Sequence, residues 1–139
     1  MAMKLELDAD EKVLKQGTMY TLQGRGRMKF PVNCRYVLTN RRFFYWDLGR
    51  WAPFHSQMGL IFLLLVRGRP VGMPLDGLKL SRGTYGMNRK LALMSAADGT
   101  SLMADRLEKV VELFREPLGT AGIGLVQTAA EEWQVRTGW

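Results

Sequence analysis

The sequence predicts a mainly β domain of about seven antiparallel strands with one helix near its C-terminal end, and three observations support this. Short runs rich in β-branched and aromatic residues follow one another with brief polar or glycine-containing connections. The pair Asp98-Gly99 lies between two such runs, which is typical of a tight hairpin turn. One longer stretch, from Leu107 to Leu118, has apolar residues at helical spacing. Consecutive antiparallel strands of this kind favour a meander that closes into a small barrel or a sandwich.

The expected strands can be placed in order along the chain. Two of them have special features. Gly59–Val66 contains the longest apolar run and is predicted to be buried on both faces or to face a partner. In Val71–Leu80, Pro74 and Gly77 indicate an edge strand or a bend. The complete set of expected strands is Val13–Leu22, Cys34–Thr39, Phe43–Trp46, Gly59–Val66, Val71–Leu80, Leu91–Ala96 and Ser101–Met103.

The helix is predicted from one apolar stripe, with charged residues covering the other side. Asp105 and Glu108 resemble a capping box at its start, with Asp in place of Ser or Thr, and Pro117 and Gly119 are expected to mark its end. A helix with a single apolar stripe after an open-ended sheet is expected to plug the end of that sheet. The stripe consists of Leu107, Val110, Val111, Phe114 and Leu118.

Residues 119–139 are expected to form a tail that is separate from a main domain of residues 1–118. Gly119, Gly122 and Gly124 are expected to act as a flexible hinge. Leu125–Trp133 is then predicted to form a second, shorter amphipathic helix.

Composition and charge limit the class of protein. With 139 residues, of which 47% are hydrophobic and 24% charged, the chain is long enough for one domain with a buried core. No apolar run approaches the length of a membrane span, no segment resembles a secretory signal, and the single cysteine, Cys34, suits a reducing compartment. We therefore expect a cytoplasmic protein.

The net charge of +7 is distributed unevenly along the chain. Residues 12–90 contain five Lys and ten Arg but only two acidic residues, whereas residues 1–11 and 91–139 each have a net charge of −3. The basic middle segment is expected to attract phosphates, anionic lipid headgroups or acidic protein surfaces, or to be an ordinary solvated surface.

Catalysis is not expected. His55 is the only histidine, so a site built on a histidine pair is excluded, and no metal or cofactor site is predicted. Cys34 and His55 could be drawn as a nucleophile and its base, but Cys34 lies within a strand-like run, where a buried, inert thiol is expected. The acidic segment before the first strand is expected to be solvated and not to form a catalytic carboxylate pair; it contains Asp8, Asp10 and Glu11.

Basic residues near the predicted turns are the candidates for anion binding. They fall in a glycine-containing loop after the first strand and around the segment Gly83–Asn88. Whether they converge on one side of the fold is not visible in the sequence. The candidates in these two places for binding an anion or a lipid headgroup are Arg25, Arg27, Lys29, Arg82, Arg89 and Lys90. An exposed aromatic residue such as Tyr85 leaves open a nucleic-acid-binding barrel as a further alternative.

Four short segments, in order, resemble the GRAM domains and their bacterial PH-like relatives. Tyr36–Phe44, with the sequence YVLTNRRFF, is similar to the signature of that family, and Asp10–Leu14 followed by Gly17 is similar to its opening. Met73–Leu78 and Arg82–Leu91 resemble two later segments of the family. The resemblance covers about residues 8 to 118. It implies a PH-like barrel of about seven strands capped by a helix, in a bacterial protein.

The resemblance implies less about function. Members of this family bind phosphoinositides or other lipids in some proteins and protein partners in others. Lys15 followed by Arg25 and Arg27 resembles the basic pattern by which PH domains hold inositol phosphates. The Thr39–Arg42 segment is expected to be structural, since Asn40 tolerates the tight turn that joins two strands.

Two departures from the family indicate a surface for a protein partner or for a second copy of the chain. One is the apolar run of residues 60–66 and the other is the tail. The tail is equally compatible with packing back on its own barrel. We expect a non-catalytic binding or scaffold domain that mediates protein–protein interaction or homodimerisation, with binding to an anionic membrane surface as the alternative. The interface candidates are Leu60, Phe62, Leu64 and Trp133.

Overall fold

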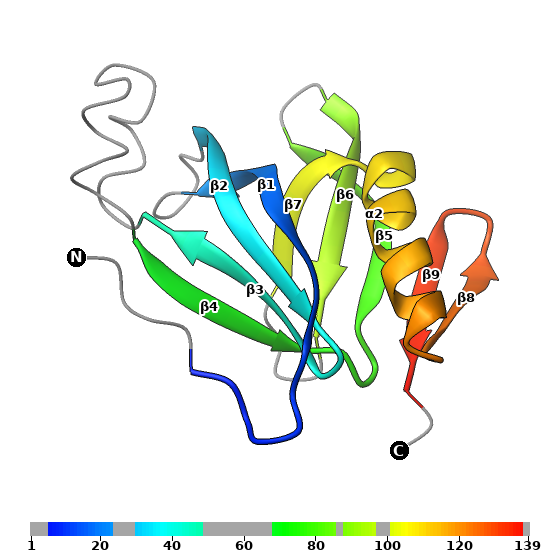
Figure 1. Cartoon of the computed structure of the whole chain (residues 1–139). Coiled ribbons are helices and arrows are strands. Elements are labelled where there is room, and N and C mark those ends of the chain that lie inside the picture. Colours follow the sequence, from blue (N-terminus) through cyan, green and yellow to red (C-terminus); the bar gives the residue numbers. More distant parts are fainter. Residues whose placement is uncertain (1–5, 24–29, 49–67, 86–87, 97–100, 138–139) are drawn as a thin grey trace.

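The computed structural model describes residues 6–23, 30–48, 68–85, 88–96 and 101–137 of the chain. Seven strands precede the helix and two follow it (Figure 1). In order the elements are β1 (Val13–Gln23), β2 (Phe30–Thr39), β3 (Arg42–Asp47), β4 (Arg69–Pro74), β5 (Lys79–Tyr85), β6 (Asn88–Ser95), β7 (Ser101–Arg106), α2 (Leu107–Thr120), β8 (Gly124–Ala129) and β9 (Glu132–Arg136). The prediction of a mainly β fold, with antiparallel strands followed by a capping helix, is confirmed.

All strand pairs are antiparallel, and the strand order is β4-β3-β2-β1-β7-β6-β5-β9-β8. The sheet therefore consists of two halves, β1–β4 and β5–β9. Within the described residues the seam between the halves, from β1 to β7, has a single residue pair, Thr21 with Ala104. Figure 1 shows the two halves facing each other, with α2 beside β5 and β6 and the β8–β9 hairpin on the outer side of the helix.

The helix stripe predicted from the sequence is the buried face of α2. Leu107, Val110, Val111, Phe114 and Leu118 are all buried in the main core. Phe114 reaches across to the first half of the sheet, where its ring centroid lies 5.2 Å from that of Phe43. Each of these fully buried side chains contributes about 1.5–3 kcal/mol relative to an exposed one. The helix thus holds the two halves together through side chains.

Both ends of the helix differ from the prediction. The capping box is wrong: the N-cap is Arg106 and has no side-chain cap bond. Asp105 instead binds Nζ of Lys109 at 3.3 Å and accepts a hydrogen bond from the backbone N–H of Tyr20. At the other end Pro117 lies inside the helix, which continues to Thr120. Proline has no N–H to donate, but its carbonyl still accepts a hydrogen bond from the N–H of Ala121 at 3.2 Å.

A Schellman motif ends α2. The N–H of Ile123 donates to the carbonyl of Leu118 at 2.9 Å, and the N–H of Gly122 donates to that of Gly119 at 3.1 Å. Gly122 has a φ of 75°, a left-handed conformation that glycine adopts without strain. Ile123 is buried in the same core as Leu118, which is the hydrophobic contact that accompanies this motif. The stretch predicted as a flexible hinge therefore includes an ordered helix cap.

The predicted C-terminal helix over Leu125–Trp133 is wrong, because the segment forms the β8–β9 hairpin. β9 pairs with β5, so that Leu80 is opposite Trp133, and β8 pairs with β9. An open strand edge on β5 offers a complete set of backbone hydrogen bonds, which outweighs a weak helical periodicity in a short segment. Val135 is buried and anchors the hairpin in the core.

Two further strand predictions, Val71–Leu80 and Gly59–Val66, compare with the structure as follows: the first is interrupted, and the second is not described. The predicted strand Val71–Leu80 covers the end of β4 and the start of β5. A turn separates the two: the N–H of Leu78 donates to the carbonyl of Leu75, and Gly77 has a φ of 78°. The predicted strand Gly59–Val66 and the turn Asp98-Gly99 lie outside the described residues, although β6 and β7 do pair as the hairpin prediction requires.

The segment before β1 is bound to the β2–β3 turn, in an arrangement that we call the N-terminal clasp (Asp8–Glu11 with Thr39–Arg42). Glu11 is buried, and Arg42 donates to both of its carboxylate oxygens, at 2.5 Å and 3.1 Å. The Thr39 hydroxyl donates to Glu11 at 2.5 Å and accepts from the backbone N–H groups of Arg41 and Arg42. Arg41 also pairs with Asp10.

The clasp joins two segments that are far apart in the sequence, the one before β1 and the β2–β3 turn. The expectation that Thr39–Arg42 is structural fits this geometry. The expectation of a solvated acidic segment is wrong for Glu11. Burial alone would raise the pKa of Glu11, but hydrogen bonds from Arg42, Thr39 and the backbone of Asp8 lower it from 4.5 to about 2.

Candidate functional site

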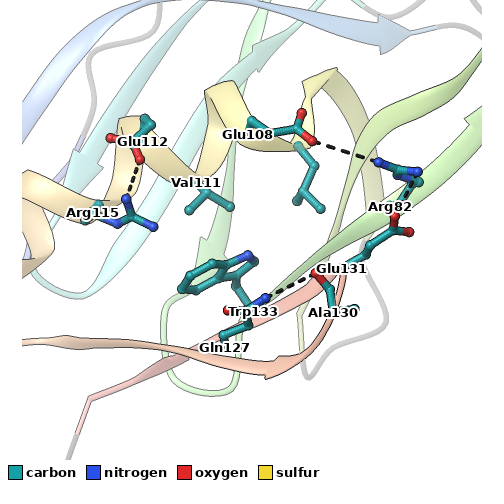
Figure 2. Close-up of a pocket in the computed structure, with 10 residues that line it drawn as sticks. Arg82, Glu108, Val111, Glu112, Arg115, Gln127, Ala130, Glu131 and Trp133 are labelled. Carbon is teal, nitrogen blue, oxygen red and sulfur yellow. Dashed lines mark hydrogen bonds and ion pairs between the residues drawn. The ribbon is translucent and has the colours of Figure 1, made fainter.

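The candidate site is a groove between α2 and the β8–β9 hairpin, with a cavity of about 310 Å³. That volume is at the small end of ligand sites in proteins and suits one long side chain with its neighbouring backbone. Figure 2 shows the groove from its open side, with the helix along one wall and the hairpin along the other. The residues that line it are Arg82, Leu107, Glu108, Val111, Glu112, Arg115, Gln127, Ala130, Glu131 and Trp133.

Helical spacing and strand register place these side chains. Glu108, Glu112 and Arg115 are at positions i, i+4 and i+7 of α2 and therefore lie along one side of the helix. Trp133 and Glu131 come from β9 and the turn before it, where the N–H of Arg82 donates to the carbonyl of Glu131 at 3.2 Å. The groove therefore exists because β9 pairs with β5.

The floor of the groove is an aromatic ring with a cation above it. The guanidinium carbon of Arg115 lies 5.3 Å from the centroid of the Trp133 ring, within the range of a cation–π interaction. Arg115 also pairs with Glu112 one turn earlier in the helix. Trp133 is partly buried and packs against the main core, so the ring is held in place while one part of it stays accessible.

The mouth of the groove contains a second arginine with two carboxylates. Nη1 of Arg82 lies 2.8 Å from Oε1 of Glu131, and its Nη2 lies 3.9 Å from Oε1 of Glu108. Figure 2 shows this guanidinium between the helix and the hairpin turn. Since both carboxylates already neutralise it, Arg82 is poorly placed for the anion binding predicted from the sequence. Counting Glu112, the groove has three carboxylates and two guanidiniums.

The groove brings together two residues that the sequence assigned to different roles, Arg82 and Trp133. Lys15 is exposed and lies elsewhere, in a second hollow with Leu14, Glu116, Pro117 and Thr120. The backbones of Arg89 and Lys90 belong to β6, and their side chains lie outside the described part. The remaining candidates, Arg25, Arg27, Lys29, Leu60, Phe62 and Leu64, also lie outside it. The described residues thus place the side chains of two anion-binding candidates, Lys15 and Arg82, and these two line different hollows.

The groove carboxylates are not singled out by the sequence. Glu108, Glu112 and Arg115 belong to the charged side of the predicted helix, and their i, i+4, i+7 spacing is the signal that they lie along one line of it. Glu131 and Gln127 could not be assigned to a site from the sequence. Their positions depend on the β8–β9 hairpin, which forms where a helix was predicted.

The thiol considered as a nucleophile is structural. Cys34 is buried, and its sulfur lies 3.5 Å from the hydroxyl of Thr21. Burial raises the pKa of this thiol, so it stays protonated and unreactive. His55, the base in that hypothesis, lies outside the described residues. In the part of the chain that is described, no helix is both long and apolar enough to cross a membrane.

Comparisons with known proteins add one similarity. No protein-family model and no curated protein matches the chain. Among solved structures, the chain is similar to the PH domain of pleckstrin homology domain-containing protein family A member 5 from human, with 16% sequence identity and a TM-score of 0.48. The similarity covers 93% of this chain and 90% of that one.

Proposed function

We propose that this chain is a non-catalytic, GRAM-like binding module whose groove takes an extended protein segment that presents an arginine or lysine side chain to Trp133. The observation that supports this most directly is the stacking of Arg115 over the Trp133 ring. The groove thus already accommodates a guanidinium, next to carboxylates that can pair with one.

Charge also favours a basic partner segment. Both walls of the groove, apart from Arg82, come from residues 91–139, which have a net charge of −3 in a chain of net charge +7. A cationic segment is therefore attracted to this end of the molecule rather than to the basic middle segment. Arg115 is about half exposed, so an incoming cation can replace it on the ring at small cost.

Selection of linear ten-residue peptides from a display library on the full chain tests this proposal. We expect the selected peptides to share an arginine or lysine at a fixed position, and Glu112→Gln to weaken their binding up to about fivefold, since an exposed ion pair contributes about 1 kcal/mol or less. Glu116→Gln is the matched control, because Glu116 is exposed on the same helix but outside the groove. Peptides without a shared cation, or equal effects of the two substitutions, would contradict the proposal.

A second candidate function, binding to an anionic membrane surface, is favoured by the excess of 13 positive charges in residues 12–90. Its candidate residues are Lys15, Arg25, Arg27 and Lys29. Vesicles of phosphatidylcholine with and without phosphatidylserine provide the test. We expect binding that weakens with salt and with the double substitution Arg25→Ala, Arg27→Ala, and unchanged binding of the double variant would exclude this role for the loop.

A further inference from the structure

The two edges of the sheet differ in what they offer to another strand. Within the described residues the outermost strands are β4 and β8. β4 contains Pro70 and Pro74, and proline has no amide hydrogen to donate to a further strand. β8 has the sequence GLVQTA, without a proline and without a charge, and five of its six residues are exposed. Charges and prolines are the usual means by which an edge avoids pairing, and β8 has neither.

We infer that β8 pairs with β8 of a second copy of this chain, in an antiparallel arrangement about a two-fold axis. Because β4 is blocked by its prolines, the pairing joins like edges, and such an isologous contact closes as a dimer instead of extending into a filament. A two-fold axis perpendicular to the sheet keeps each face on its own side, so the buried face of each hairpin stays buried.

The residue at the centre of this contact is Val126. Its side chain is 40% exposed, which makes it one of the few large hydrophobic residues on the described surface. It lies opposite Gln134 of β9, on the outer face of the hairpin. With the two-fold axis at Val126, the Val126 side chains of the two copies lie directly opposite each other, and Gln134 of each copy lies beside its own Val126. This row across the dimer contains two β-branched side chains and no charge.

The charges nearest to this row lie on β9, one strand behind the contact. On the outer face of β9, Glu132 lies on one side of Gln134 and Arg136 on the other. The antiparallel two-fold arrangement places Glu132 of one copy at the same end as Arg136 of the other. In the dimer the two β8 strands separate these charges by three strand spacings, about 14 Å, so they add little to the association, and uncharged β8 residues make the contact itself.

Sedimentation equilibrium or native mass measurement on the full chain tests the inference. We expect the mean mass to rise with protein concentration from 15.8 kDa toward twice that value. Val126→Lys should abolish the rise, because it places two like charges opposite each other at the axis. The matched control is Val13→Lys, which changes an equally exposed valine on β1, away from the edge, and should leave the association unchanged.

A charge-swap experiment identifies the position of the axis. Val126→Lys and Val126→Glu should each be monomeric alone, and their mixture should form a mixed dimer, since opposite charges then face each other. A chain that stays monomeric at all concentrations, or a Val126→Lys variant that still dimerises, would overturn the inference. Val126 does not line the groove, so peptide binding should be the same in these variants. Failure of the dimer can thus be told apart from failure of the proposed function.

Discussion

The N-terminal clasp and the C-terminal groove are both built from arginine and carboxylate side chains, but they differ in exposure to solvent. In the clasp the Glu11 side chain is fully buried, and both of its oxygens accept hydrogen bonds from Arg42. In the groove Arg82 is 36% exposed and its partners Glu131 and Glu108 are 49% and 72% exposed. Breaking a buried pair leaves an uncompensated charge in the protein, whereas water replaces the partner in an exposed pair. The same chemistry therefore stabilises the fold at one end and leaves groups available for exchange at the other.

The largest effect expected from this difference is that of Arg42→Ala. It leaves the buried carboxylate of Glu11 with only the hydrogen bonds from Thr39 and Asp8, and we expect a loss of about 3 kcal/mol in the free energy of unfolding. Urea denaturation of the full chain measures it. Arg42→Lys keeps the charge but loses the bidentate geometry, so its loss should be smaller. A loss below about 1 kcal/mol for Arg42→Ala would mean that the clasp behaves like a surface ion pair.

Acid should affect the clasp in a defined pH range. Because the pKa of Glu11 is about 2 in the folded protein and near 4.5 when unfolded, its stabilising effect is complete above pH 4.5 and is lost as the pH falls toward 2. The shift corresponds to about 3 kcal/mol. Urea denaturation at pH 6 and pH 3 should show that Glu11→Gln has less of this acid-dependent loss than the unmodified chain. Identical pH profiles would show that Glu11 is not the group responsible.

The smallest effect is expected in the groove. Arg82→Ala breaks two exposed ion pairs, and we expect the free energy of unfolding to change by about 0.5 kcal/mol or less. The same urea experiment at pH 7 measures it. A loss above about 2 kcal/mol would mean that Arg82 belongs to the scaffold, in which case the groove could not exchange its partners as the proposed function requires.

Features that depend on local spacing were predictable from the sequence, and features that depend on long-range register were not. The apolar stripe of α2 was identified residue by residue, because helical periodicity is visible within a few turns. The hairpin after α2 was missed, since it forms by pairing of β9 with β5, about 50 residues earlier in the chain. The groove could not be predicted for the same reason. Arg82 and Trp133 are both candidates in the sequence, but only the β5–β9 pairing shows that they lie together.

The N-terminal clasp could not be predicted from the sequence for a different reason. The acidic residues at 8–11 and the basic pair Arg41-Arg42 were both apparent, but nothing local indicates that they meet or that Glu11 is buried. The contact depends on the pairing of β1 with β2, which places Val13 opposite Thr39 and so brings the two segments together.

The seam between β1 and β7 has a consequence for how the molecule moves. In the described residues the halves share one residue pair there, and side-chain packing such as that of Phe43 against Phe114 also joins them. Packing tolerates small sliding motions better than a ladder of directional bonds does. The corner at Thr21 and Ala104 should therefore act as the hinge of a slow breathing motion, and its amide hydrogens should exchange with solvent earlier than those in the middle of either half.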